Sequence, residues 1–254
     1  MKYFVDEQSI VRKIWGKTDT ILFIFGGAAA EFALNKAVDW LYFTGKLPND
    51  PIGRLFSTVT FAQKIIFEKE EKDLNAIRNI VKIHSKTETD RDALIPDWAY
   101  RDVLYMLIYY SISAYELLEN RLSNDEKEEV FKVFIKLGKE MNLKNLPTNY
   151  NNWLIDRENH LKLDTQYSDF TFHLLHQYKL HLGDFRYRIL LEVQKLLVPK
   201  IVFERLKFKS YSKILIVLLV YKNLKNLQFV KWLKFKLLPK KYESLLKSLD
   251  FYVQ

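Results

Sequence analysis

The chain has no cysteine and little glycine or proline. Seven glycines and six prolines in 254 residues are too few turn formers for an all-β or Rossmann-type chain. The lack of cysteine excludes disulfides, iron–sulfur clusters, thiolate ligands to iron and cysteine nucleophiles. Long apolar runs are also missing. The longest, Thr20 to Ala30, has eleven residues, whereas a membrane span needs about twenty.

What remains is typical of a helical globular protein. Apolar residues make up 48% of the chain and aromatic residues 15%, which excludes a disordered protein. Apolar positions recur at helical spacing almost throughout, so we expect one all-α, multi-helix domain. Asp50 and Pro51 predict a helix start, from which a helix runs to about Phe67. We further expect a helix from Thr18 to Thr44, a loop over 85–94 and a helix break near Gly183.

The positive charge is concentrated at the C-terminal end. The whole chain carries a net +9, but residues 200–254 hold 12 Lys and 1 Arg against three acids, or +10, which leaves −1 for residues 1–199. We expect 1–199 to form the main domain and 200–254 a basic helical extension packed on it.

Aromatic residues are interleaved with the lysines of this extension, as in the run from Val230 to Leu238. Such a pattern favours peripheral contact with an anionic membrane. Nucleic-acid binding and simple capping of the domain by long lysine side chains are the alternatives. The first residues lack the apolar core of a secretory signal. We therefore expect a cytoplasmic protein, at most peripheral to a membrane.

One histidine lies on an apolar helical face. The spacing places four residues on that face: Leu74, Ile77, Val81 and His84. Arg54 and Thr58, four residues apart, share a face of the preceding helix. A buried histidine close to a buried arginine indicates a tetrapyrrole pocket, while the plainer interpretation is a core histidine with a hydrogen-bond partner and an arginine paired with Asp50, Glu68 or Glu70.

Signatures of other chemistries are absent. The sequence has no phosphate-binding glycine loop, no HExxH, no GxSxG, no EF-hand loop and no zinc spacing. His173 and His176 share a helical face and His181 follows, so a metal site there is conceivable. No carboxylate stands three or four residues after His173 or His176 to complete a di-iron pattern.

The segment from Asp50 to Thr58, DPIGRLFST, resembles the D-P-x-x-R-L-x-x-T motif of the MpaB-like oxygenases, the haem protein family that includes the latex clearing proteins. The segment from Ala76 to His84, AIRNIVKIH, is similar to the helix that supplies the proximal haem histidine in that family. The order and spacing of the two motifs also agree, and the resemblance runs from about Ile14 to Arg205.

The resemblance implies a globin-like helical core that binds haem b. His84 would be the axial iron ligand, and Arg54 and Thr58 would lie in the haem pocket as cofactor-binding and catalytic residues. The expected reaction is oxygenation, with O₂, of an apolar substrate such as a lipid or terpenoid.

Two departures support a second interpretation. Ser57 stands where latex clearing proteins have a lysine, and Gly26-Gly27 stands where many relatives have a His-Pro pair. Without these polar groups the chain could be a non-catalytic haem-binding protein or a membrane-associated helical binding protein. Turnover of O₂ with product formation separates the two interpretations.

Overall fold

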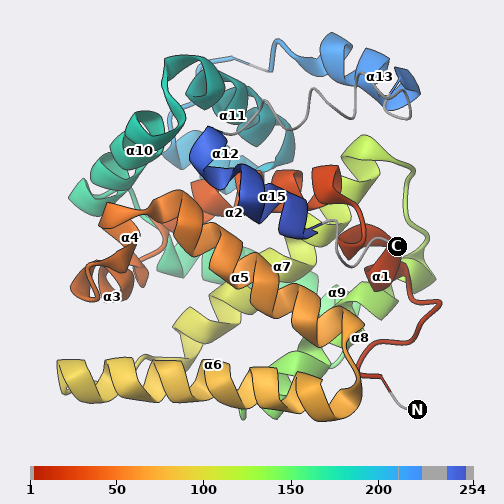
Figure 1. Cartoon of the computed structure of the whole chain (residues 1–254), viewed down its shortest axis with the longest axis vertical. Helices are drawn as coiled ribbons and strands as arrows, with labels where there is room; N and C mark the ends of the chain where they lie inside the picture. The colour runs from red at the N-terminus through yellow and green to blue at the C-terminus, as the bar shows by residue number, and fades with distance from the viewer. Residues whose placement is uncertain (1–2, 211, 225–238, 250–254) are drawn as a thin grey trace.

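The computed structural model describes residues 3–210, 212–224 and 239–249, and over these ranges the chain is helical. The extended contacts between described residues are two isolated bridges, Tyr3 with Lys69 and Asn35 with Thr165. The expected all-α class is confirmed (Figure 1). The helices enclose one main core, and the division between residues 199 and 200 stays a prediction.

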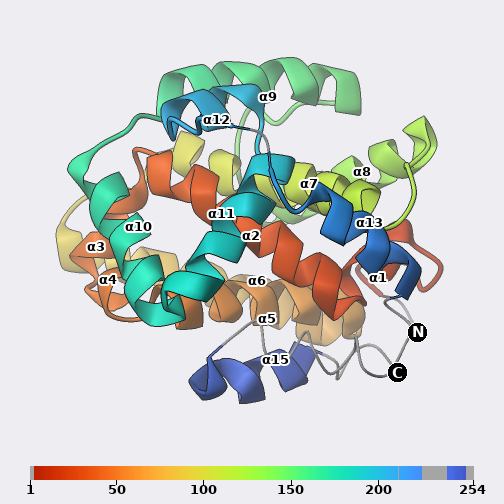
Figure 2. The ribbon, with the colours of Figure 1, turned by 90° about the horizontal axis from the view of Figure 1, so that it is seen from above.

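Helix α2 (Thr18–Leu34) is the central element and packs against α7 (Asp97–Leu118) and α11 (Asp184–Leu197) (Figure 2). Its small residues permit this close packing. A Cβ on Gly27 would lie 2.4 Å from the ring of Tyr110 on α7, so only glycine fits there. Helix α2 stops earlier than expected, because Asn35 is extended and its side chain accepts a hydrogen bond from the Ala37 amide. The chain restarts as α3 (Val38–Phe43) and α4 (Lys46–Asn49).

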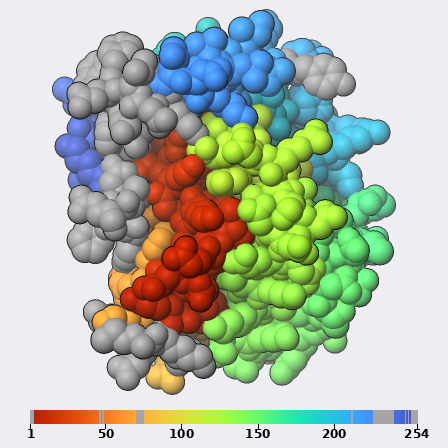
Figure 3. Space-filling view, turned by 90° about the vertical axis from the view of Figure 1, so that its right-hand side faces the viewer, coloured from red at the N-terminus to blue at the C-terminus, as the bar shows by residue number. Residues whose placement is uncertain are grey.

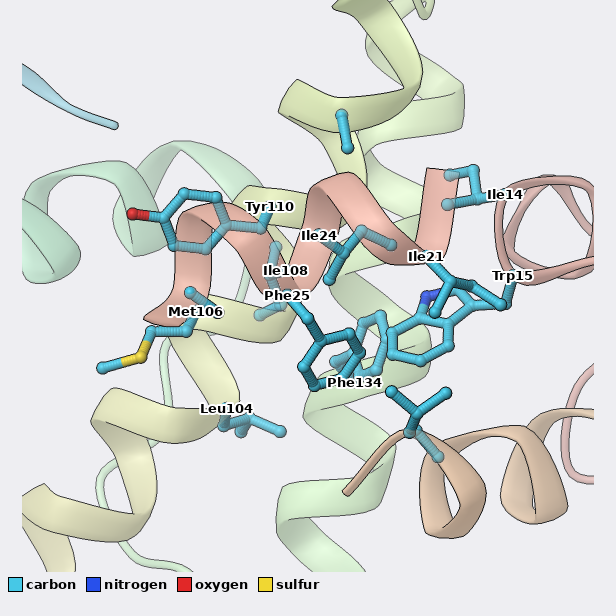
Figure 4. Close-up of a cluster of buried hydrophobic side chains, with 14 of the residues drawn as sticks. Ile14, Trp15, Ile21, Ile24, Phe25, Leu104, Met106, Ile108, Tyr110 and Phe134 are labelled. Carbon is cyan, nitrogen blue, oxygen red and sulfur yellow. The ribbon is translucent and has the colours of Figure 1, made fainter. Parts of the chain in front are cut away.

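The core next to α2 is aromatic and aliphatic (Figure 4). Trp15, from α1 (Ile10–Trp15), is fully buried and contacts the rings of Phe25 and Phe134 at 6.0 Å. Its indole N–H donates to the Ser111 hydroxyl at 3.0 Å, which satisfies the one polar atom of the side chain. Phe134 belongs to α8 (Asn124–Glu140), which begins at a capping box formed by Ser123 and Glu126.

Helices α5 (Pro51–Phe67) and α6 (Glu70–Arg91) form an antiparallel pair. Asp50 caps α5 and Pro51 is its first residue, as expected. The expected loop over 85–94 is wrong, because α6 continues through this polar stretch to Arg91. Thr87 and Thr89 donate to carbonyls four residues back, and Asp92 ends the helix in the left-handed conformation, at φ 52°.

The C-terminal half covers α2 and α7. It contains α9 (Tyr150–Asp164), α10 (Asp169–Leu182), α11, α12 (Lys200–Arg205), α13 (Leu215–Leu224), the 3₁₀ turn η2 (Lys240–Tyr242) and α15 (Glu243–Leu249). The expected break at Gly183 is confirmed, at φ 77°. The aromatic run from Val230 to Leu238 lies outside the described residues. Within the described part of the chain, no helix combines the length and apolarity needed to cross a membrane.

Candidate functional site

His84 lies on α6, where this helix faces α5 and α7. Its ring centre is 5.0 Å from that of Tyr100 on α7. The Nδ1 atom is buried and makes no hydrogen bond to any part of the chain that the structure describes. Ile77, one helical repeat earlier, is 2% exposed, but Val81 is 37% exposed, so the predicted stripe enters the core only in part. A buried imidazole nitrogen without a partner is costly and needs an explanation.

The histidine is held in its neutral form. Burial lowers the pKa of His84 to about 4, the positive charge of Arg54 adds to this effect, and Glu88 opposes it. At neutral pH the imidazole therefore keeps a free lone pair, which is the form that binds a metal.

Arg54 is partly buried on α5 and close enough to His84 to act on its charge. Its Nη1 donates to the Thr58 hydroxyl at 3.1 Å, which confirms that the two side chains meet. Burial lowers the pKa of Arg54. Among the described side chains, no carboxylate forms an ion pair with this guanidinium, and Asp50 instead accepts hydrogen bonds from Tyr242 and from the Gly53 amide. The counter-charge for Arg54 is thus not supplied by a described acid.

Arg91 is a third candidate, missed from the sequence. It stands seven residues after His84 on α6, which places it on the same helical face. Its guanidinium pairs with Asp39 at 2.8 Å and lies over the rings of Trp40, at 4.2 Å, and Phe43, at 5.4 Å. Its Nη1 is buried with no hydrogen-bond partner in the described structure. The seven-residue spacing between His84 and Arg91 could have identified Arg91 from the sequence, but only if the helix is taken to continue beyond residue 85.

Hydrogen bonds of Glu88 connect the His84 helix to α7 and to the segment before it. Glu88, one turn after His84, accepts hydrogen bonds from the Ile95 amide at 3.0 Å and the Tyr100 hydroxyl at 3.2 Å. Burial and this carboxylate raise the pKa of Tyr100. The bond holds the Tyr100 ring against His84, so the imidazole is positioned by packing and its Nδ1 stays available.

An apolar cavity of about 90 Å³ lies on another face of α5. Ile52, Phe56 and Val59 line it from α5, Phe25 from α2 and Leu249 from α15. Arg54 and Thr58 are not among its lining residues. The cavity is smaller than the roughly 300 Å³ at which typical small-molecule pockets begin.

A second polar cluster joins α7 and α9. His160 Nδ1 lies 2.6 Å from a carboxylate oxygen of Asp102 and 3.1 Å from one of Asp164, while Asn35 donates to the other oxygen of Asp102 at 2.5 Å. The three ligand atoms of Asp102, His160 and Asp164 are close enough to hold a metal ion. In the observed arrangement Nδ1 of His160 is within hydrogen-bonding distance of both carboxylates, so the three side chains form a hydrogen-bonded network with one another.

The other histidines do not converge. His173 pairs with the Tyr42 hydroxyl at 2.8 Å, and His181 with the Tyr242 hydroxyl at 3.0 Å. Within the described chain they form no common group of metal ligands with His176. The sequence motif of three nearby histidines is therefore explained by separate contacts.

The His160 cluster predicts a pH-dependent stability. Burial disfavours the charged imidazole, but the hydrogen bond and charge of Asp102, with Asp156 and Asp164, together raise the pKa of His160. A raised pKa stabilises the fold below the unfolded value, about 6.5, and this contribution is lost as the pH rises through the folded value. Urea unfolding from pH 5.5 to 8.5 should show the stability difference between the native protein and His160→Gln shrinking as the pH rises. The opposite contribution of His84, whose lowered pKa makes stability rise up to about pH 6.5, cancels from this difference. Equal slopes would assign the pH dependence to other groups.

The fold and the site thus define an all-α protein with a neutral histidine and two arginines on adjoining helices. Residues 13–153, more than half of the chain, match the family model described as ER-bound oxygenase mpaB/B'/rubber oxygenase, catalytic domain. The chain belongs to this oxygenase family. His84, Arg54 and Arg91 lie inside the matched region and His160 lies outside it. No curated protein and no solved structure matches the chain.

Proposed function

We propose that the protein is a haem b-dependent oxygenase that acts with O₂ on an apolar, lipid- or terpenoid-like substrate. The observation that carries this proposal is the neutral imidazole of His84, whose buried Nδ1 has no hydrogen-bond partner among the described residues, beside an arginine that no described acid neutralises. A lone pair and an adjacent unpaired cation fit a metal porphyrin with its carboxylate groups. The family supports oxygenation as the reaction class.

Each residue then has a defined task. His84 would hold the iron, as the resemblance implies. Arg54, oriented by Thr58, and Arg91, oriented by Trp40 and Asp39, would bind carboxylates or place a positive charge near bound oxygen. Haem b, when bound, supplies the binding and activation of O₂. The chain's own contribution is to hold the group, neutralise it and exclude water.

The alternative is a haem-binding or membrane-associated helical protein without turnover. Ser57 gives a specific reason to keep it: the residue is exposed, and its hydroxyl proton is donated to the Gly53 carbonyl at 3.1 Å within the same helix, so that proton is not directed at the site. We also keep as proposals the haem domain over 1–199 with its extension over 200–254, and the cytoplasmic location.

One experiment tests the proposal. Purified protein is reconstituted with haem, its absorption spectrum is recorded, and O₂ uptake is followed with an unsaturated lipid or terpenoid. A Soret band with substrate-dependent O₂ uptake supports an oxygenase. A Soret band without uptake supports the non-catalytic haem-binding alternative. The absence of haem binding overturns both haem-dependent functions and leaves the membrane-associated helical protein.

Arg54→Ala should weaken haem binding without unfolding the protein. We expect the affinity for haem to fall about tenfold, equivalent to about 1.4 kcal/mol, because a guanidinium that neutralises the cofactor is lost. The apo melting temperature should change little, since no described ion pair is broken. Haem titration and thermal melts measure the two effects.

Arg78→Ala is the control for this change, because Arg78 is exposed on α6 and pairs within its own helix with Asn75. A lower apo melting temperature with unchanged haem binding would mean that Arg54 pairs with a protein acid and does not belong to the site.

A further inference from the structure

Most of the apolar side chains of helix α13 are exposed to solvent. It is fixed to the protein by Leu218, which is 6% exposed, and by Tyr221, whose hydroxyl donates to Asp19 at 3.1 Å. Lys213, just before the helix, donates its amide to Glu192. Six other large apolar residues are between 42% and 74% exposed: Leu215, Ile216, Val217, Leu219, Val220 and Leu224. Figures 1 and 3 show the helix on a rim of the molecule.

This exposed face is wider than the stripe that a helix usually presents to a protein groove. Single exposed apolar residues are ordinary, but a contiguous group marks an interaction surface. At 100° per residue the six side chains span an arc of about 200°. The arc also contains the exposed Asn223, whose side-chain amide donates to the Leu219 carbonyl at 3.0 Å. An amphipathic helix packed in a protein groove presents a stripe of about 100°. An arc of twice that width fits a medium that encloses the helix from several sides, as the acyl region of a bilayer does.

The charges beside α13 select the kind of bilayer. Lys207, Lys209 and Lys213 are exposed immediately before the helix. They belong to the segment 200–254, whose net charge is +10. A second copy of the chain at this face would bring the same lysines together, which is unfavourable, whereas anionic lipid headgroups complement them.

We propose that α13 docks on an anionic membrane surface, with its apolar face in the headgroup–acyl boundary and the three lysines at the headgroups. Ten residues are too few to span a bilayer, so the contact is interfacial. The surface differs from the predicted Val230–Leu238 run, and it does not depend on haem. It would hold the protein where lipid-like molecules are concentrated.

Vesicle co-sedimentation of the full chain tests the proposal. The probes are vesicles of phosphatidylcholine alone and of phosphatidylcholine with about 30% phosphatidylserine, compared at low and high salt. We expect binding to the anionic vesicles, weakened by salt. The double variant Ile216→Asp, Val217→Asp should bind at least tenfold more weakly. Replacing each of the three lysines by glutamine should cost about fivefold, or about 1 kcal/mol per charge.

The matched control is Ile155→Asp, Leu163→Asp on α9, because these side chains are 65% and 66% exposed, like those replaced in α13. The control should bind as the native protein does. Equal binding to neutral and anionic vesicles, or equal losses in both double variants, would overturn the proposal. A third contradicting result combines two observations: the native protein does not bind vesicles, and it self-associates in analytical ultracentrifugation whereas the α13 variant does not. A second copy of the chain would then be the partner of α13.

Discussion

His84→Ala is expected to lack the Soret band that the native protein shows after reconstitution with haem. The substitution removes the only described imidazole whose buried nitrogen has no hydrogen-bond partner. It also removes a group that is neutral at physiological pH, because burial and Arg54 lower the pKa of His84 to about 4. The apo fold should survive, since the side chain makes no hydrogen bond to the described chain. Absorption spectra and haem content per chain measure the result.

His176→Ala is the control, because this histidine is exposed and stacks on Phe172. It should keep the native spectrum. Added imidazole gives a further test, because it should restore haem binding and the Soret band of His84→Ala if His84 is the residue that would hold the iron. A variant that retains the native spectrum and haem content would remove His84 from the site.

The fold was predictable where local rules decide the structure. Helical periodicity gave the all-α class, and Asp50, Pro51 and Gly183 marked helix ends through capping, a fixed φ and a positive φ. The errors come from polar residues. Asn35 ends α2 because its side chain bonds to Asp102 and to the chain after the helix, and that contact depends on the tertiary fold.

The incorrect prediction of a loop over 85–94 also affected which residues were assigned to the site. Its polar composition indicated a loop, but tertiary contacts of Glu88 and Arg91 with other helices hold it as part of α6. Ending the helix at His84 hid Arg91 from the face on which His84 lies. Local composition therefore concealed a residue that helical spacing alone would have found.

The His160 cluster illustrates what one sequence can and cannot show. Asp156, His160 and Asp164 follow at intervals of four on α9, and this spacing was visible. Asp102, the partner at 2.6 Å, is 58 residues away along the chain. Only the packing of α7 against α9 brings it near, and no local pattern encodes that contact.

Arg157→Met is expected to destabilise the protein by about 3–5 kcal/mol. Arg157 on α9 and Glu31 on α2 are 4% and 2% exposed and form a paired contact at 3.0 and 2.7 Å. Tyr110 donates to the same carboxylate at 2.9 Å, and the ring of Tyr109 lies 4.4 Å from the guanidinium. Removing the arginine leaves a carboxylate in the core without its cation, and desolvation of that charge is the main cost. Urea unfolding measures the loss.

The exposed pair on the same helix is the control. Lys162 and Glu158 lie 2.6 Å apart but are 56% and 62% exposed, so Glu158→Ala should cost no more than about 0.5 kcal/mol. The contrast between the two pairs separates the effect of burial from that of an ion pair as such. Similar losses in the two variants would contradict the argument.

The double variant Glu31→Leu, Arg157→Met should recover much of the stability that Arg157→Met loses. With both charges absent, neither is left buried and unpaired, and two apolar side chains of similar volume fill the space. Tyr110 then keeps one buried hydroxyl without its acceptor, so recovery should be complete only when Tyr110→Phe is added. A double variant no more stable than Arg157→Met would mean that a buried unpaired charge is not the cause of the destabilisation in Arg157→Met. The ion pair would then contribute through the packing geometry between α2, α7 and α9.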